Sequence, residues 1–139
     1  MIILDTNVVS EPLKPSGSPI VRDWLDRQDA ATLFLTATSL SELLVGVEFL
    51  PLGKRKEGLS VALAELLREL FEGRILPFDE AAAIRYAKLV GAGKANGHSI
   101  AVADGQIASI ASVRGFTVAT RDEHPFQVAG VATVNPWHG

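Results

Sequence analysis

Hydrophobic positions along the chain fall into short apolar runs and into longer stretches with helical spacing. The apolar runs predict five strands, at residues 2–4, 32–36, 75–78, 117–120 and 131–134. Between them, hydrophobic side chains recur every three or four residues, which is typical of helices with one buried face. Because strands and helices alternate, the pattern predicts a parallel sheet covered by helices on both faces, in one three-layer α/β domain over residues 1–139.

Capping and stop residues predict where several helices begin and end. Ser18-Pro19 combines a capping side chain with a proline at the first helical position. Asp79 can cap the helix after the third strand. The helix after the second strand is expected from about Ser39, where Ser39-Leu40-Ser41-Glu42 also fits a capping box. Gly115 is expected to stop a helix over residues 102–113.

Composition narrows the class of protein. A chain of 139 residues with 47% hydrophobic residues suits one folded core and argues against disorder. No stretch approaches the roughly 18 uninterrupted apolar residues of a membrane span, and Asp5 follows the first apolar residues too soon for a secretory signal. The absence of cysteine argues against disulfides, a thiol nucleophile and a cysteine zinc site, so we expect a cytoplasmic protein.

Four acidic residues lie next to the strands of the predicted sheet. Asp5 ends the first strand directly, and Asp122 follows the fourth strand. Glu42 is expected in the first turn of the helix after the second strand, and Asp104 in the first turn of the helix before the fourth. Since the carboxyl ends of parallel strands share one rim, where ligands gather, we expect Asp5, Glu42 and Asp122 to converge there. The rule does not fix Asp104, because the start of its helix is not clearly signalled.

Four ionised carboxylates at one rim would repel one another, and this repulsion would need to be compensated. Two ionised carboxylates about 5 Å apart repel by roughly 3 kcal/mol at an effective dielectric of about 20, whereas a helix N-terminus returns only about 0.3–1 kcal/mol. Either some acids bind protons with a raised pKa, or a divalent cation lies among them. Oxygen ligands favour Mg²⁺ or Mn²⁺. Such a cation activates water and neutralises charge on phosphate, which predicts hydrolysis of a phosphodiester.

Each acid also has a purely structural interpretation. Asp5 could cap the turn after its strand, and Glu42 could complete the capping box. Asp104 could stabilise its helix through the macrodipole, and Asp122 could be an ordinary turn residue. The joint placement of the four acids favours a site that binds a divalent cation. The net charge of −3 gives no general attraction to a polyanion, so a nucleic-acid partner would be held locally or through a cation.

Polar residues beside the acids are secondary candidates. Thr6, Asn7 and Thr120 carry hydroxyl and amide groups of the kind that orient ligands next to carboxylates. Thr6 and Asn7 could equally cap the first helix. The three histidines have no evident partner and are expected at the surface.

Several of these segments are familiar from a known family. The opening Ile3-Leu4-Asp5-Thr6-Asn7-Val8-Val9-Ser10-Glu11 resembles that of PIN-domain ribonucleases, especially the VapC-type toxins of bacterial toxin–antitoxin pairs. The similarity continues through Ser41-Glu42-Leu43, Ala103-Asp104-Gly105-Gln106-Ile107-Ala108 and Ala119-Thr120-Arg121-Asp122. The ending Asn135-Pro136-Trp137 looks like the FitB-like branch. The resemblance extends over residues 2–137.

The resemblance implies a five-stranded parallel sheet and an Mg²⁺- or Mn²⁺-dependent endoribonuclease that acts as a toxin on RNA. By matching motif, Asp5, Glu42, Asp104 and Asp122 would be the catalytic and metal-binding set, with Thr120 as a polar helper. It also implies a homodimer and a cognate antitoxin whose segment blocks the acidic site, often with a basic side chain. Operator DNA would be bound only through the antitoxin, and no membrane is implied.

One stretch departs from the family pattern, and two other functions stay open. Gly91, Gly93 and Gly97 interrupt what is usually a well-formed helix. Asp5 could instead form an aspartyl-phosphate, although haloacid-dehalogenase-type phosphatases have a second Asp two residues on, where this chain has Asn7. A non-catalytic PIN-like module could use the acids only to receive a partner's basic segment.

Overall fold

A five-stranded parallel sheet forms the centre of the structure, a computed structural model that describes residues 1–139. The strand order is β3-β2-β1-β4-β5, and all four neighbouring pairs are parallel. The strands are β1 (Ile2–Leu4), β2 (Leu33–Thr36), β3 (Ile75–Leu76), β4 (Thr117–Ala119) and β5 (Thr133–Val134). The two edge strands, β3 and β5, have only two residues each. Strand β3 ends before Pro77, which has no N–H to donate to a ladder.

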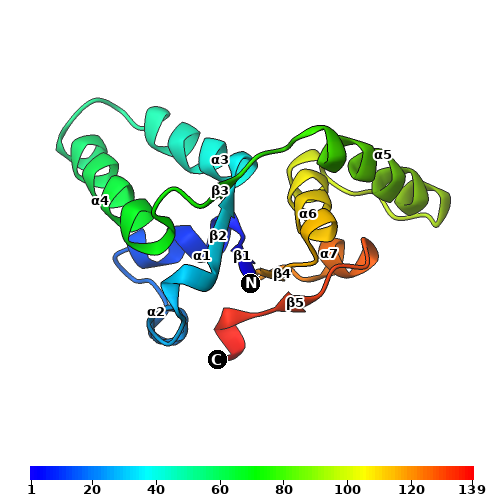
Figure 1. Cartoon of the computed structure of the whole chain (residues 1–139). Helices are drawn as coiled ribbons and strands as arrows, with labels where there is room; N and C mark the ends of the chain where they lie inside the picture. The colour runs from blue at the N-terminus through cyan, green and yellow to red at the C-terminus, as the bar shows by residue number, and fades with distance from the viewer.

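Helices cover both faces of the sheet, so the predicted three-layer α/β architecture is confirmed (Figure 1). One face carries α1 (Thr6–Ser10), α2 (Pro19–Asp26), α3 (Ala37–Glu48) and α4 (Lys54–Phe71). The other face carries α5 (Glu80–Ala95), α6 (Val102–Arg114) and α7 (His124–Val128). Three short 3₁₀ helices are η1 (Glu11–Leu13), η2 (Ala30–Thr32) and η3 (Pro136–His138). None of the helices combines the length and apolar character that a membrane span requires.

Two hydrophobic cores lie on opposite faces of the sheet. Successive residues of β1 point to opposite sides, so Leu4 joins the core under α1–α4 and Ile3 joins the core under α5–α7. Phe71 of α4 is fully buried in the first core, and Phe126 of α7 is fully buried in the second. Burial on both faces fixes the strands, and with them the rim at which they end.

Most of the expected helix ends are confirmed. The Ser18 hydroxyl accepts a hydrogen bond from the Val21 N–H at the start of α2, and Asp79 Oδ1 accepts one of 3.0 Å from the Ala82 N–H at the start of α5. Gly115 ends α6 with a φ of 70°, a left-handed conformation that glycine adopts without steric cost.

The start of α3 differs from the prediction. The helix begins at Ala37, and the Thr36 hydroxyl caps it by accepting a hydrogen bond of 3.0 Å from the Ser39 N–H. The capping box proposed for Ser39 and Glu42 is therefore wrong, because the last residue of β2 already supplies the cap. Glu42 consequently lies in the second turn of α3, and its side chain is free for another partner.

Candidate functional site

Asp5 lies where β1 ends, and both of its carboxylate oxygens are held in place. Its backbone N–H donates to the Ala119 carbonyl at 2.9 Å, which extends the pairing of β1 with β4 by one residue. Its side chain is 7% exposed. Oδ1 accepts a hydrogen bond from the Thr6 N–H and thereby caps α1, while Oδ2 accepts one from the Thr120 hydroxyl, both at 2.8 Å. Asp5 is thus both a helix cap and an oriented carboxylate.

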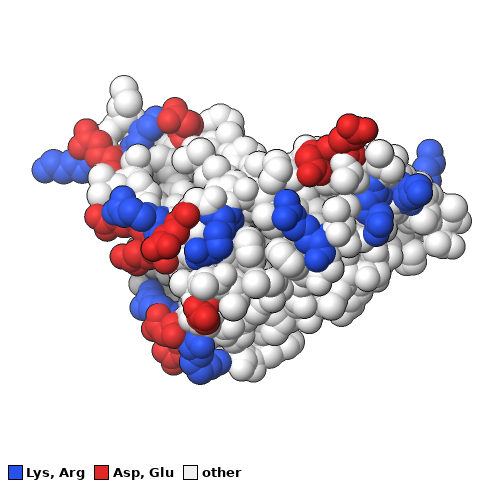
Figure 2. Space-filling view, viewed as in Figure 1, with Lys and Arg blue, Asp and Glu red and all other residues white.

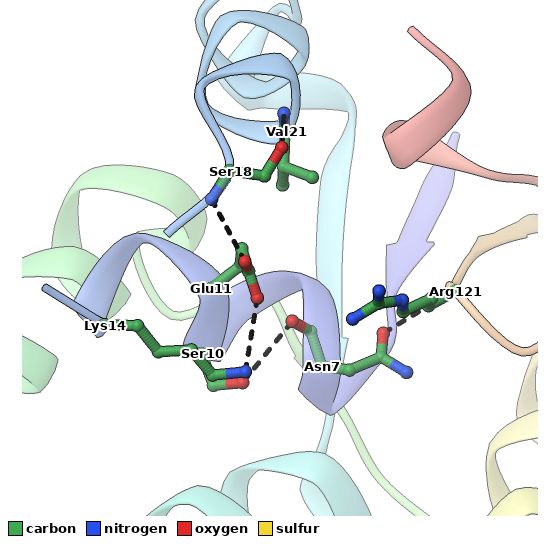
Figure 3. Close-up of polar contacts among 7 residues, drawn as sticks. All are labelled: Asn7, Ser10, Glu11, Lys14, Ser18, Val21 and Arg121. Carbon is green, nitrogen blue, oxygen red and sulfur yellow. Dashed lines mark hydrogen bonds and ion pairs between the residues drawn. The ribbon is translucent and has the colours of Figure 1, made fainter. Parts of the chain in front are cut away.

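Thr120 and Asn7 hold the loop after β4 against α1. Thr120 is fully buried, and its Oγ1 accepts a hydrogen bond of 3.2 Å from the backbone N–H of Asp122. Asn7 Oδ1 accepts one of 3.4 Å from the backbone N–H of Arg121, which joins the side chain of a residue of α1 to the backbone of this loop (Figure 3). Asp122 itself is exposed at the rim.

Thr6 connects the end of β1 with α3. Its hydroxyl donates a hydrogen bond of 2.8 Å to Glu42 Oε1. Because Asp5 caps α1, neither Thr6 nor Asn7 has the capping role that the sequence left open for them. Glu42 is exposed to solvent, yet one of its oxygens is fixed at the same rim as Asp5.

Asp104 reaches the rim from the other face of the sheet. It is the third residue of α6 and is half-buried. Together with Asp122 it lines a pocket of about 350 Å³. The uncertain start of its helix is resolved by Ala101, whose carbonyl accepts from the Gly105 N–H and so begins α6 at Val102.

The pKa values of two of these acids reflect how close all four lie. Burial raises the pKa of Asp5 above its ordinary value, the hydrogen bonds from Thr120 and Thr6 lower it, and the charges of Asp104 and Glu42 raise it again. Burial also raises the pKa of Asp104, and the charges of Asp122 and Glu42 add to the effect. The charges of the four carboxylates therefore act on one another, including that of Asp104, which the rim argument had left unplaced.

No basic side chain compensates this negative charge. The one ion pair of the structure joins Lys14 to Glu11, so none of the four acids lies within 4 Å of a Lys, Arg or His nitrogen. Four carboxylates without a protein counterion leave a position of strongly negative potential at the rim. A cation that entered it would relieve the repulsion.

The donor set has the right chemistry for a hard divalent cation. All the candidate ligands are carboxylate oxygens, with hydroxyl groups beside them, as Mg²⁺ and Mn²⁺ prefer. No three acidic or histidine side chains lie close enough to form a ready-made metal cage. Mg²⁺ is usually held by one or two carboxylates and completes its coordination shell with water, so an open arrangement of this kind suits it.

Glu11 is a buried acid that sequence reasoning did not single out. It is 7% exposed, and its Oε1 accepts a hydrogen bond of 3.0 Å from the Ser18 N–H (Figure 3). Lys14 Nζ lies 3.3 Å from Oε2. The Ser18 N–H bond lowers the pKa of Glu11, and burial opposes it while Lys14 and Arg121 reinforce it. The partner seven residues downstream leaves no periodic signal in the sequence. Glu11 fixes the turn between η1 and α2 rather than joining the four acids.

An apolar groove opens beside the acidic rim. A cavity of about 680 Å³ lies between α1, η1, α3 and α4, and its apolar lining includes Leu43 and Leu59. Thr6 and Glu42 form its acidic end, and Arg55 of α4 also lines it. No signal in the sequence predicted this groove, because its walls come from helices whose packing angle is set by the tertiary fold.

Comparisons with known proteins agree with the geometry. The model of the PIN domain family matches residues 2–131. The chain is 47% identical over 138 residues to Toxin FitB of Neisseria gonorrhoeae, with 99% of each chain covered. It is 43% identical over 137 residues to a protein of Sinorhizobium fredii named VapC ribonuclease Y4jK, covering 99% of this chain and 98% of the relative. Among solved structures, FitAB bound to a DNA fragment superimposes with a TM-score of 0.94 at 45% identity, covering 100% of this chain and 97% of the other.

Proposed function

This chain belongs to the PIN domain family, and from that starting point we propose that it is a metal-dependent endoribonuclease acting as the toxin of a toxin–antitoxin pair. The observation that carries the proposal is the gathering of Asp5, Glu42, Asp104 and Asp122 at one rim without a basic counterion. The names of the relatives, a toxin and a ribonuclease, support the same class of activity.

The four acids have distinct parts in this proposal. Asp5 and Asp104, the two with raised pKa values, would hold Mg²⁺ or Mn²⁺, and the exposed Glu42 and Asp122 would complete the set. When bound, the cation supplies a Lewis acid that lowers the pKa of water and offsets charge on a phosphate. Thr120 fixes the orientation of the Asp5 carboxylate, and Thr6 fixes that of Glu42. The two hydroxyl groups are positioning groups that hold the carboxylates of Asp5 and Glu42 in fixed orientations.

RNA would be held locally rather than by a broad electrostatic field. The net charge is −3, and on the face shown in Figure 2 acidic and basic side chains are interspersed over α2 and α4. A cation at the rim would supply the positive charge that the surface lacks. Since RNA is the proposed substrate, we place the activity in the cytoplasm.

The apolar groove suits the proposed antitoxin. A partner segment with apolar side chains would fill the cavity of about 680 Å³, and a basic side chain beyond it would reach Glu42 at the acidic end. Such a segment would block the acids and compensate their charge. DNA would then be bound by the antitoxin of the complex, and the similar FitAB structure is itself bound to a DNA fragment.

Self-association is the remaining part of the proposal. Leu44 and Val45 on α3, together with Phe49 and Leu52 beyond its end, are large apolar side chains that are 44–92% exposed. Exposed apolar side chains grouped in this way are typical of protein–protein contacts. We expect a homodimer at micromolar concentration by light scattering, and a strict monomer would contradict this part.

The central test is RNA cleavage with purified protein. We expect cleavage of single-stranded RNA with Mg²⁺ or Mn²⁺, none with EDTA, and a loss of at least about 100-fold in Asp5→Asn and Asp104→Asn. Asp79→Asn is the matched control, because it removes one carboxylate while keeping the cap of α5. Equal activity in wild type and both rim variants would refute the proposal.

Two measurements separate this function from the alternatives. An aspartyl-phosphate mechanism of the haloacid-dehalogenase type has a second Asp two residues after the nucleophile, whereas this chain has Asn7 at that position. We therefore expect no covalent labelling of Asp5 by a phosphoryl donor. A non-catalytic interaction module would show no calorimetric binding of Mg²⁺ or Mn²⁺ near neutral pH, whereas we expect binding that is lost in Asp104→Asn.

A further inference from the structure

Two histidines stand side by side next to the acidic rim. His98 lies in the loop between α5 and α6, and His124 is the first residue of α7. Their ring centroids are 5.9 Å apart in an edge-to-face arrangement, with 73° between the planes. Both residues are exposed, and both line the pocket of about 350 Å³ that also contains Asp104 and Asp122. The two histidines therefore line the same pocket as two of the four acids.

A second cavity beside this pocket has a basic side chain in its lining. This cavity of about 470 Å³ is lined by residues 97–100, which also line the first pocket, and by Lys94 near the end of α5. Carboxylates, two imidazole rings and an ammonium group therefore occur in the linings of two neighbouring cavities. This combination of chemical groups suits a strand of nucleotides whose reacting phosphate lies at the acids.

The backbone of the loop between α5 and α6 fixes the position of His98. The His98 N–H donates a hydrogen bond of 2.7 Å to the Gly93 carbonyl, and Gly97 turns the chain with a φ of 77°. A Cβ on Gly93 would lie 2.9 Å from the His98 carbonyl oxygen and 3.2 Å from Ile100 Cδ1. Glycine at position 93 therefore lets the loop close onto α5. The expected interruption at Gly91 and Gly93 does not occur, because α5 continues through both residues to Ala95, and Gly93 instead serves this close approach.

We propose that His98 and His124 bind the base of an unpaired nucleotide next to the scissile phosphate, and that Lys94 contacts the phosphate beyond it. This inference rests on the proposed ribonuclease function. Imidazole rings stack on unstacked RNA bases, and a lysine ammonium binds phosphate as a point charge. Carboxylates alone repel RNA, so a substrate at this rim needs such contacts nearby. The exposed ring faces favour a single-stranded substrate, whose bases are free to turn outward.

The first test measures RNA binding without cleavage. Fluorescence anisotropy with a labelled single-stranded RNA of mixed sequence, in EDTA, gives the dissociation constant. Losing a stacking platform weakens binding by roughly 5- to 150-fold, which we expect for His98→Ala and for His124→Ala. His98→Phe and His124→Phe keep an aromatic face and should stay within about threefold of wild type. His138→Ala is the matched control, since His138 is exposed and lies in η3, away from this pocket.

Two further experiments test the charge of Lys94 and identify the nucleotide that contacts the histidines. Lys94→Gln should weaken binding and reduce the slope of log affinity against log salt by about one, as for one lost phosphate contact. We also expect a series of RNAs, each with one abasic nucleotide at a different position near the cleavage site, to include one special position. With the abasic nucleotide at that position, His98→Ala should bind the RNA no more weakly than wild type does. At that position the missing base is the one that contacts the imidazoles.

The outcomes distinguish this inference from the proposed function. Alanine variants that bind RNA like wild type, or phenylalanine variants as weak as alanine variants, would overturn it. So would variants that weaken binding of a protein partner while leaving RNA binding unchanged. If wild type cleaves RNA but the histidine variants have an unchanged KM, only the nucleotide site fails. If the histidine effect on RNA binding is present but no metal supports cleavage, the nucleotide site stands and the ribonuclease proposal fails.

Discussion

The Thr120 hydroxyl donates a hydrogen bond of 2.8 Å to Asp5 Oδ2, joining residues that directly follow the neighbouring strands β4 and β1. Both side chains are buried, so this bond is shielded from water. Thr120 Oγ1 also accepts a hydrogen bond of 3.2 Å from the Asp122 N–H. One hydroxyl therefore orients a buried carboxylate and also fixes the loop that carries a second acid.

Removing the Thr120 hydroxyl should lower metal affinity and RNA cleavage more than it lowers the stability of the fold. We expect Thr120→Val to lower metal affinity and RNA cleavage by about 10- to 100-fold, as for other residues that orient metal ligands. Losing the donated hydrogen bond should also raise the pKa of Asp5 further, because the bond stabilises the ionised form. Thr120→Ser keeps the hydroxyl and should retain most of the activity. Isothermal titration with Mg²⁺ and single-turnover cleavage measure the two effects, and a fully active Thr120→Val protein would contradict this role.

Neutralising Asp104 should stabilise the metal-free protein at neutral pH. Its pKa is raised in the folded state, so the folded protein binds protons more tightly there than the unfolded chain does, and stability falls as pH rises from about 3.8 through the folded pKa. Asp104→Asn removes that cost. We therefore expect its Tm in EDTA at pH 7 to be higher than that of wild type.

Varying the pH and adding Mg²⁺ test whether the charge of Asp104 causes this difference in Tm. The Tm advantage of Asp104→Asn should shrink as pH falls toward 3.8, where wild type is also protonated, and Mg²⁺ should reduce it by stabilising wild type more strongly. Asp79→Asn should show neither trend. An Asp104→Asn protein that is less stable than wild type in EDTA at pH 7 would show that this acid is compensated by contacts within the fold.

The fold could be predicted from the sequence because its signals are local. Alternating apolar runs and helical spacing identified all five strands, and the caps at Ser18 and Asp79 were correct because each side chain bonds within its own helix. The start of α3 was misplaced because two hydroxyl residues, Thr36 and Ser39, were both possible caps. Both residues are fully buried, and the choice between them depends on where β2 ends, which is set by its pairing with β1 and β3.

Two glycines of α5 should respond oppositely to the same substitution. Nothing lies within 4 Å of a Cβ on the exposed Gly91, so Gly91→Ala should stabilise the protein by about 0.5–1 kcal/mol through helix propensity. At Gly93 the new Cβ would press on the His98 carbonyl oxygen, so Gly93→Ala should destabilise the protein and weaken RNA binding together. Urea unfolding and anisotropy measure both quantities. Equal stabilisation in the two variants would mean that the loop carrying His98 is not held by this contact.

Glu11→Gln should weaken the fold in a pH-dependent way without changing the acids at the rim. The pKa of Glu11 is lowered in the folded state, so its ionised form contributes stability that is present above about pH 4.5 and lost as pH falls through the folded pKa. Glutamine keeps an acceptor for the Ser18 N–H but loses the charge. We expect a loss of about 1 kcal/mol at pH 7 that vanishes in acid, measured by urea unfolding. A constant difference at all pH values would contradict it.

Less of the site than of the fold could be predicted from sequence. The strand ends indicated the rim for Asp5, Glu42 and Asp122, because topology alone brings strand ends together. The bonds from Thr6 to Glu42 and from Thr120 to Asp5 join residues 36 and 115 positions apart, and no local pattern encodes them. The pairing of His98 with His124 depends in the same way on how α5, α6 and α7 pack.

The acids come from four elements spread along the polypeptide, from the end of β1 to the loop after β4. A ribosome-bound nascent chain therefore lacks the full set until that last loop has been synthesised and the sheet has closed around it. Prematurely terminated products that end before Asp122 would therefore carry at most three of the four acids.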